Sequence, residues 1–434
     1  MKETPVLKYD ITFDNSYLPT PMISPVEDMD SWNFYSFPSI RTTDGNLTLW
    51  TKVYFAWVNT KLPLFTESWF MENIKEIPVI LLHSMYALTC TAPIAMGGSW
   101  KAGDANHSQA KKLLPQVLDI PNPFTAAAFL LMGIYADNSS RSITSVSYYG
   151  LAIRMTQRLG IHRGGEVLWF SQNGTLMSNE SMPAKLFCDH LWWHAYEYDY
   201  YSSKLAKLPC IIVDESDILI GYPTGSVQNL MQDTYHSYYY SLIRIAKRVE
   251  HHLKTSMGDI YQQDQLHNDL TRWVTELPRW LQVIPQVYST DDTSTTVPSW
   301  RIAYLHCFCH YLFIQIRKGQ FIMSLSDPLA NGNNPYTATC FESASVISKI
   351  LKIILTHNPT FTGIPDNIAS CIFEAAGVQV ISTLINGQSP GLTKTLDMML
   401  NAFGLVSMFS STAEKYAETL KKWIANPNEA LHSF

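Results

Sequence analysis

Two groups of residues in this sequence have side chains of the types that bind metal ions. The candidates are His251 with His252, and the set His306, Cys307, Cys309 and His310. A helix would place His306 and His310 on one face, four residues apart. No glutamate follows His306 as a zinc-protease motif requires, and Cys307 and Cys309 lack the two-residue gap and further ligands of a structural zinc site. We therefore expect no metal and predict packed or hydrogen-bonded core histidines.

The sequence contains no convincing catalytic motif. An all-helical, aromatic-rich chain is compatible with a terpene-cyclase-like enzyme, which needs clustered carboxylates to hold magnesium and a diphosphate. Asp291-Asp292 is the sole pair of adjacent aspartates, and its Ser/Thr-rich surroundings contain no third carboxylate. A nucleophile elbow, a phosphate-binding loop and a dinucleotide fingerprint are also absent from the sequence. The sequence thus predicts a protein that is not an enzyme, and an all-α enzyme is the least favoured alternative.

Composition and charge restrict the partners of this chain. Its 434 residues are 46% hydrophobic and 16% charged, with a formal net charge of -6 and a pI near 6.1. Proteins that hold nucleic acid through phosphates carry basic patches, so we expect no direct nucleic-acid binding. The start resembles no secretory signal, and the scattered, odd set of seven cysteines suggests free thiols in a reducing compartment. The apolar stretches 79–96 and 368–385 are interrupted by polar residues, so we expect no membrane span.

Periodicity predicts the elements that position these residues. Residues 1–48 are rich in proline without a sustained period and are predicted to form an irregular linker segment. From 49 to 434, apolar residues recur at spacings of three and four between proline-marked breaks. We therefore predict an all-α fold, a large irregular bundle of stacked helix pairs, with 49–434 as its helical domain.

Two of the predicted helices are especially informative. In the first, about 147–159, Gly160 occupies the position of a left-handed C-terminal cap. The second, about 184–205, is apolar nearly all round and is expected to be buried on most sides. Within it, Asp199 needs a cation or several donors to stay charged, and we predict Arg154 or Arg158 as its partner.

These two helices carry a paired motif. Residues 150–163 read GLAIRMTQRLGIHR, and residues 191–199 read LWWHAYEYD. They are followed by residues 206–211, AKLPCI, and the acidic segment 214–217, DESD. The order resembles the middle homology region of fungal zinc-cluster transcription factors, and the similarity extends from about residue 50 to 355. In this resemblance the structural motif residues are Arg154, Gly160, His162, Trp192, Trp193, Asp199 and Pro209.

The resemblance has departures. Asp189-His190 stands where the family has Arg-Arg, Tyr200 replaces an arginine, and Ala206-Lys207 replaces Gly-Arg. The family's DNA-binding module is an N-terminal six-cysteine cluster that holds two zinc ions, but no cysteine precedes Cys90. Either that module was removed from this sequence or the protein lacks one, and zinc is expected only in that module, with no cofactor in this chain.

The resemblance implies a regulatory domain that controls transcription in the nucleus, with possible shuttling to the cytoplasm. Some family members sense metabolites or drugs through this region, and the 23 Tyr, 19 Phe, 12 Trp and 16 Met residues are suited to line an apolar pocket or simply to fill a large core. Expected partners are a small apolar effector, co-regulator proteins and a second copy of the chain in a homodimer. The alternative is a constitutive helical scaffold for dimerisation and partner binding. As effector-binding residues we predict Trp193, Tyr196, Tyr200, His306, His310 and Arg317.

Overall fold

The computed structural model describes residues 45–92, 100–223, 230–255, 258–282, 300–325, 334–361, 363–387 and 389–434. The predicted linker 1–48 lies outside the described residues except for its last four positions, where a helix already begins at Gly45. The chain divides into two compact units, and the boundary lies between His236 and Ser237. Each unit has its own core and is considered separately.

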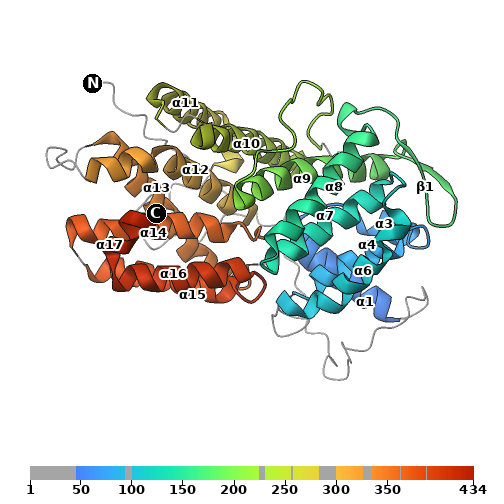
Figure 1. Cartoon of the computed structure of the whole chain (residues 1–434), viewed down its shortest axis with the longest axis horizontal. Coiled ribbons are helices and arrows are strands. Elements are labelled where there is room, and N and C mark those ends of the chain that lie inside the picture. The colour runs from blue at the N-terminus through green and yellow to red at the C-terminus, as the bar shows by residue number, and fades with distance from the viewer. Residues whose placement is uncertain are drawn as a thin grey trace. The chain divides into compact units, whose positions relative to one another are not determined.

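The described elements of the first part of the chain, up to His236, are helices and one small two-stranded hairpin (Figure 1). Its elements are α1 (Gly45–Val53), the π-helical η3 (Tyr54–Val58), α2 (Asn59–Lys61), α3 (Glu67–Glu72), α4 (Val79–Thr89), η4 (Trp100–Gly103), α6 (Asp104–Val117), α7 (Pro123–Asn138), α8 (Ser142–Arg158), η5 (Ile161–Arg163), β1 (Leu168–Phe170), β2 (Leu176–Ser178) and α9 (Met182–Ala206).

In the second part, from Ser237, every described element is a helix. They are α10 (Leu230–Thr255), which carries the boundary, α11 (Ile260–Glu276), η6 (Arg279–Leu281), α12 (Trp300–Leu325), α13 (Pro335–His357), α14 (Ile368–Asn386), α15 (Pro390–Val406), α16 (Ser411–Ala425) and α17 (Pro427–Ser433). The all-α prediction is therefore confirmed.

Prolines mark helix starts more often than helix ends. Pro123, Pro335 and Pro390 each occupy the first turn of a helix, where no backbone N–H is needed. The preceding residue supplies the cap: the side chain of Asn122 accepts from the N–H of Phe124 at 2.8 Å. The proline-marked breaks of the sequence are thus N-terminal signals at these helices.

In the first unit, α7 lies at the centre of the core. Residues 123–136 are all buried, and α7 packs against α4 and α8, with α9 packed beside α8 (Figure 1). In the second unit, α14 contacts α12, α13, α15, α16 and α17. A helix that is apolar on all sides is expected at such central positions.

Residues Ile368–Ile385 of α14 have the length and hydropathy of a membrane span, although the sequence suggested none. In this window 56% of the residues are buried within the protein itself. Its contacts with five neighbouring helices make it the core helix of its unit. Composition alone does not distinguish these two roles, but the packing does.

The hairpin was missed by the sequence analysis. Leu168 pairs with Ser178 and Phe170 with Leu176, and the connecting turn contains Gly174 at φ +78°. An Asn-Gly pair at residues 173 and 174 is the signal that identifies such a turn. The two strands are only three residues long, so their alternation was too brief to stand out.

Candidate functional site

The predicted cap at the end of α8 is present. Gly160 has φ +72°, and its N–H donates to the carbonyl of Gln157 at 3.0 Å. This turn leads directly into η5 and places His162 in a buried position. The carbonyl oxygen of His162 then accepts the N–H groups of Leu219 and Ile220 at 2.9 and 3.1 Å. A helix cap thereby anchors a segment more than fifty residues further along the chain.

Asp217 is the carboxylate that this turn binds. Arg163 donates to it from Nη2 at 2.7 Å and from Nε at 3.1 Å, and Nε2 of His162 lies 3.1 Å away. Hydrogen bonds from Arg163 and then from His162 hold the pKa of Asp217 below its usual value. Because the carboxylate is half exposed, solvent screens this cluster and its stabilising contribution is modest.

The aromatic residues of α9 bind the same segment from the other side. Trp193 is buried and donates from Nε1 to the carbonyl of Gly221 at 2.8 Å, and the hydroxyl of Tyr196 donates to Glu215. The ring of Trp192, fully buried, lies 5.1 Å from the ring of His162. Trp193 and Tyr196 of the paired motif therefore bind this segment, while Trp192 packs against the histidine that anchors it.

The predicted arginine partner of Asp199 is wrong. Asp199 is buried and accepts the backbone N–H groups of Ile211 and Ile212 at 2.8 and 3.0 Å. Arg154 is exposed on α8 and donates to Gln157 instead, and Arg158 is also exposed. Backbone donors stabilise a buried carboxylate as a cation would, without the desolvation of a second charge. The sequence contained no sign of which donors would reach it.

The end of α9 is a Schellman cap formed without glycine. Lys207 has φ +56°, and its N–H donates to the carbonyl of Lys204 at 3.3 Å. The N–H of Leu208 donates to the carbonyl of Ser203 at 2.9 Å. The residue pair that replaces the family's Gly-Arg thus keeps the left-handed turn at a conformational cost. Pro209 follows on the exposed surface.

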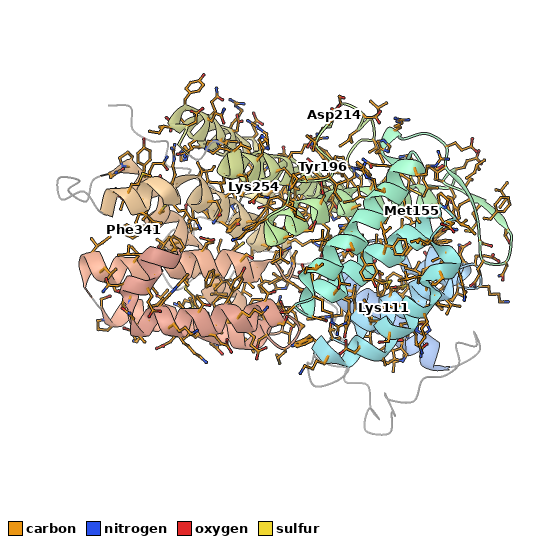
Figure 2. All side chains as sticks on the ribbon, viewed as in Figure 1. Lys111, Met155, Tyr196, Asp214, Lys254 and Phe341 are labelled. Carbon is orange, nitrogen blue, oxygen red and sulfur yellow. The ribbon has the colours of Figure 1, made fainter. Side chains whose placement is uncertain are left out.

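We call residues 208–223 the strap. The strap has no helix or strand, and Asp214 lies on the outside of the protein while Tyr196 lies on the helix beneath it (Figure 2). Side chains that hydrogen-bond to the strap are those of His162, Arg163, Trp193, Tyr196, Asp199 and Ser203. The paired sequence motif therefore holds an extended segment against α9 and against the turn that follows α8.

The six predicted effector-binding residues fall in both units. Trp193, Tyr196 and Tyr200 lie on α9 of the first unit, and all three are buried. His306, His310 and Arg317 lie on α12 of the second unit. Trp193 and Tyr196 are already hydrogen-bonded to the strap. The prediction that all six line one pocket stays a prediction.

His306 and His310 are buried and hydrogen-bonded within the second unit. His306 donates from Nε2 to the carbonyl of Leu281 at 2.8 Å, which places its proton on Nε2, and Nδ1 of His310 lies 3.2 Å from the hydroxyl of Ser343. Burial lowers the pKa of His306 to about 4. Burial, and next the neighbouring His306, lower the pKa of His310 to about 3. Both rings are therefore neutral at physiological pH.

No group of three or more His, Cys, Asp or Glu side chains suited to a metal ion occurs among the described residues. Of the other histidine pair, His252 is buried and its Nδ1 lies 3.0 Å from Oε1 of Gln262. Asp291-Asp292 lies outside the described residues.

Arg317 has the most distinctive surroundings of the six. Its Nη2 donates to Asp264 of α11 at 2.6 Å, and its guanidinium carbon lies 4.9 Å from the ring centre of Tyr336 at the start of α13. The arginine side chain is 6% exposed, whereas that of Asp264 is 51% exposed. Sequence reasoning missed Asp264 and also His267, which lies one turn further along α11. Only the packing of α11 on α12 brings them to Arg317.

Comparison with known protein families gives a match. The family model described as "Fungal specific transcription factor domain" matches residues 51–284, more than half of the chain. The match begins where the sequence resemblance began and ends before α12, so residues 285–355 of that resemblance lie beyond it. No solved structure gave a significant match.

Similar curated proteins are also regulators of transcription. They include an uncharacterized transcriptional regulatory protein of Schizosaccharomyces pombe, 25% identical over 44% of this chain and 23% of that protein. The thiamine repressible genes regulatory protein thi1 of the same yeast is 21% identical over 59% of the chain and 32% of its own length. The activator of stress genes protein 1 of Candida albicans is 24% identical, over 57% of the chain and 28% of its own length.

The matched stretches thus span between 23% and 32% of the length of these relatives. The family and the relatives are transcriptional regulators and not enzymes. The paired motif and the strap that it fastens lie wholly inside the matched residues. This chain belongs to the family of the fungal specific transcription factor domain.

Proposed function

We propose that this chain is an effector-responsive regulatory domain, which binds a small, largely apolar molecule and passes the signal to the transcription machinery in the nucleus. Membership of the family supports the transcriptional role. The observation that supports an effector is Arg317 on α12: its side chain is buried, yet its Nη1 atom has no hydrogen-bond partner among the described residues. A buried donor without a partner costs about 1–3 kcal/mol, which a bound molecule would recover.

Ligand-dependent stabilisation tests this proposal. The purified chain is heated with a panel of metabolites and xenobiotics, because a molecule present at one hundred times its Kd stabilises the folded state by about 2.7 kcal/mol. A reproducible rise in Tm with one chemical class supports an effector. A well-folded chain whose Tm is unchanged throughout the panel contradicts it. A fluorescent fusion in fungal cells tests the nuclear location.

A second candidate is a constitutive scaffold that dimerises or holds co-regulators. The hairpin favours it, because Leu168, Phe170 and Leu176 share one face and are 53%, 64% and 58% exposed. Adjacent exposed apolar side chains of this kind mark interaction surfaces.

Sedimentation of the wild-type chain and of Phe170→Thr distinguishes the two candidates. A dimer that the substitution weakens at least tenfold supports the scaffold. A monomer at tens of micromolar, together with an effector-dependent Tm, supports the first proposal. The buried neighbour Trp169 should not be used, because its loss would disturb the core.

A further inference from the structure

Asp264, His267 and Arg317 come together where α11 packs on α12, and Gln320 follows Arg317 by about one turn of α12. Asp264 and His267 are three residues apart on α11, and Arg317 and Gln320 are three residues apart on α12, so each pair lies on one face of its helix. Asp264 and Arg317 are in direct contact. The charge of Arg317 also acts on the ring of His267, whose pKa falls to about 4, mainly through burial and next through this charge.

In the part of the chain that the structure describes, three buried atoms of these residues have no hydrogen-bond partner. They are Nη1 of Arg317, Nδ1 of His267 and Oε1 of Gln320. The first is always a donor. A neutral histidine carries its proton on either ring nitrogen, and the oxygen and nitrogen of a glutamine amide exchange places on a simple flip. All three positions can therefore present an N–H group.

A group that accepts several hydrogen bonds and carries a negative charge would satisfy these donors together. A carboxylate does so, and arginine binds it through paired N–H groups. A ligand would reach Arg317 from the side of Asp264, because the Asp264 side chain is half exposed while that of Arg317 is almost completely buried. The ring of Tyr336, whose centre is 4.9 Å from the guanidinium carbon, stacks against the arginine and supplies apolar surface.

We infer that the cluster of Asp264, His267, Arg317 and Gln320 is a binding site for a small organic carboxylate with an apolar body. Nη1 of Arg317 donates to one carboxylate oxygen, and His267 and Gln320 donate to the remaining lone pairs. Asp264 orients the guanidinium from the solvent side. This inference rests on the proposed effector-responsive function and gives the effector its charged group.

The test compares carboxylates with matched uncharged molecules. Benzoate and octanoate are titrated into the full chain at pH 7 and constant ionic strength, alongside benzamide and octanamide, with Kd measured by calorimetry. We expect the carboxylates to bind the wild type, and Arg317→Gln to weaken them ten- to one-hundredfold, as the loss of a charged hydrogen bond requires. The amides should lose less than threefold.

Two further variants control this result. Arg248→Gln removes a comparable ion pair, because Nη2 of Arg248 on α10 lies 2.7 Å from the carboxylate of Asp269 on α11. Unlike that of Arg317, the side chain of Arg248 is 56% exposed. This variant should leave carboxylate affinity unchanged. If Arg317→Gln fails to fold, Gln320→Met keeps the size of the side chain and removes its amide, and we expect three- to tenfold weaker carboxylate binding.

Equal carboxylate affinity of wild type, Arg317→Gln and Gln320→Met would overturn the inference, as would a wild type that binds neither carboxylate at 10 mM. Amide binding by the same wild type in that case would leave the effector-responsive function standing. A rise in Tm with other molecules of the panel would have the same meaning. The two failures are therefore distinguishable.

Discussion

The buried side chain of Asp199 anchors the strap to α9. It accepts the N–H groups of Ile211 and Ile212, so truncating it leaves two backbone donors without this acceptor. We expect Asp199→Ala to lower the free energy of unfolding by about 2–4 kcal/mol, and Asp199→Asn by about half as much, because the amide keeps one acceptor. Urea denaturation measures both values.

Asp214→Ala is the matched control for Asp199. Asp214 is exposed in the same strap and accepts the backbone N–H of Ser216, two residues further along the strap, at 2.8 Å. Its loss should cost less than about 1 kcal/mol. Limited proteolysis should cut the strap faster in Asp199→Ala alone. Similar losses in both variants would mean that Asp199 does not anchor the strap.

His306 and His310 predict how stability depends on pH. Their folded pKa values of about 4 and about 3 lie below the unfolded value near 6.5, so the unfolded state binds more protons in this window. The stabilisation is fully present above pH 6.5 and is lost as the pH falls toward 4 and 3, by about 1 kcal/mol for each histidine at pH 5.5. Denaturation curves at pH 7.5 and 5.5 give the difference.

His306→Gln should reduce this pH dependence, because its amide nitrogen can take the place of Nε2 and donate to Leu281 but does not titrate. His357 is exposed at the end of α13 and serves as the control position. An unchanged dependence of stability on pH in His306→Gln, or the same change in His357→Gln, would argue against the buried ring as the cause.

At the scale of elements, the end of α9 contains a removable strain. Lys207 adopts φ +56°, a conformation that costs a side chain with a Cβ about 1 kcal/mol or more. We expect Lys207→Gly to raise the free energy of unfolding by about 0.5–1 kcal/mol, after the larger entropy of glycine in the unfolded chain is counted. Thermal or urea unfolding tests this value.

Lys204→Gly provides the opposite control. Lys204 lies in the helical part of α9, three residues before the cap, where glycine costs about 1 kcal/mol. If Lys207→Gly raises the free energy of unfolding and Lys204→Gly lowers it, the left-handed backbone at residue 207 is the cause. A loss at both positions would show that the lysine side chain at 207 contributes more than its conformation costs.

For the whole molecule, charge gives the clearest expectation. With a net charge of -6, this chain should not bind duplex DNA saturably at 150 mM salt, because phosphate contacts need a basic surface. Fluorescence anisotropy with a random 30-base-pair duplex measures this. Saturable micromolar binding that weakens with salt would contradict the expectation and would make this chain part of the DNA-binding apparatus.

The sequence by itself determined the local features of this protein. The left-handed cap at Gly160, the helix around residues 184–205 and the all-α class follow from short-range chemistry, namely apolar periodicity, proline at first turns and a residue free to adopt positive φ. The motif that shows the family is also local, because its residues lie on two consecutive helices. An Asn-Gly turn even marked the hairpin that was missed.

Only the tertiary structure decided which distant groups meet. Asp199 received backbone donors instead of an arginine, because the strap passes over α9 while Arg154 faces solvent. The six predicted effector-binding residues fell in two units, and Asp264 and His267 joined Arg317 because α11 packs on α12. Periodicity fixes which face of a helix is apolar, but it does not specify which other helix covers that face. Partner choice depends on packing across the whole chain, which no local pattern encodes.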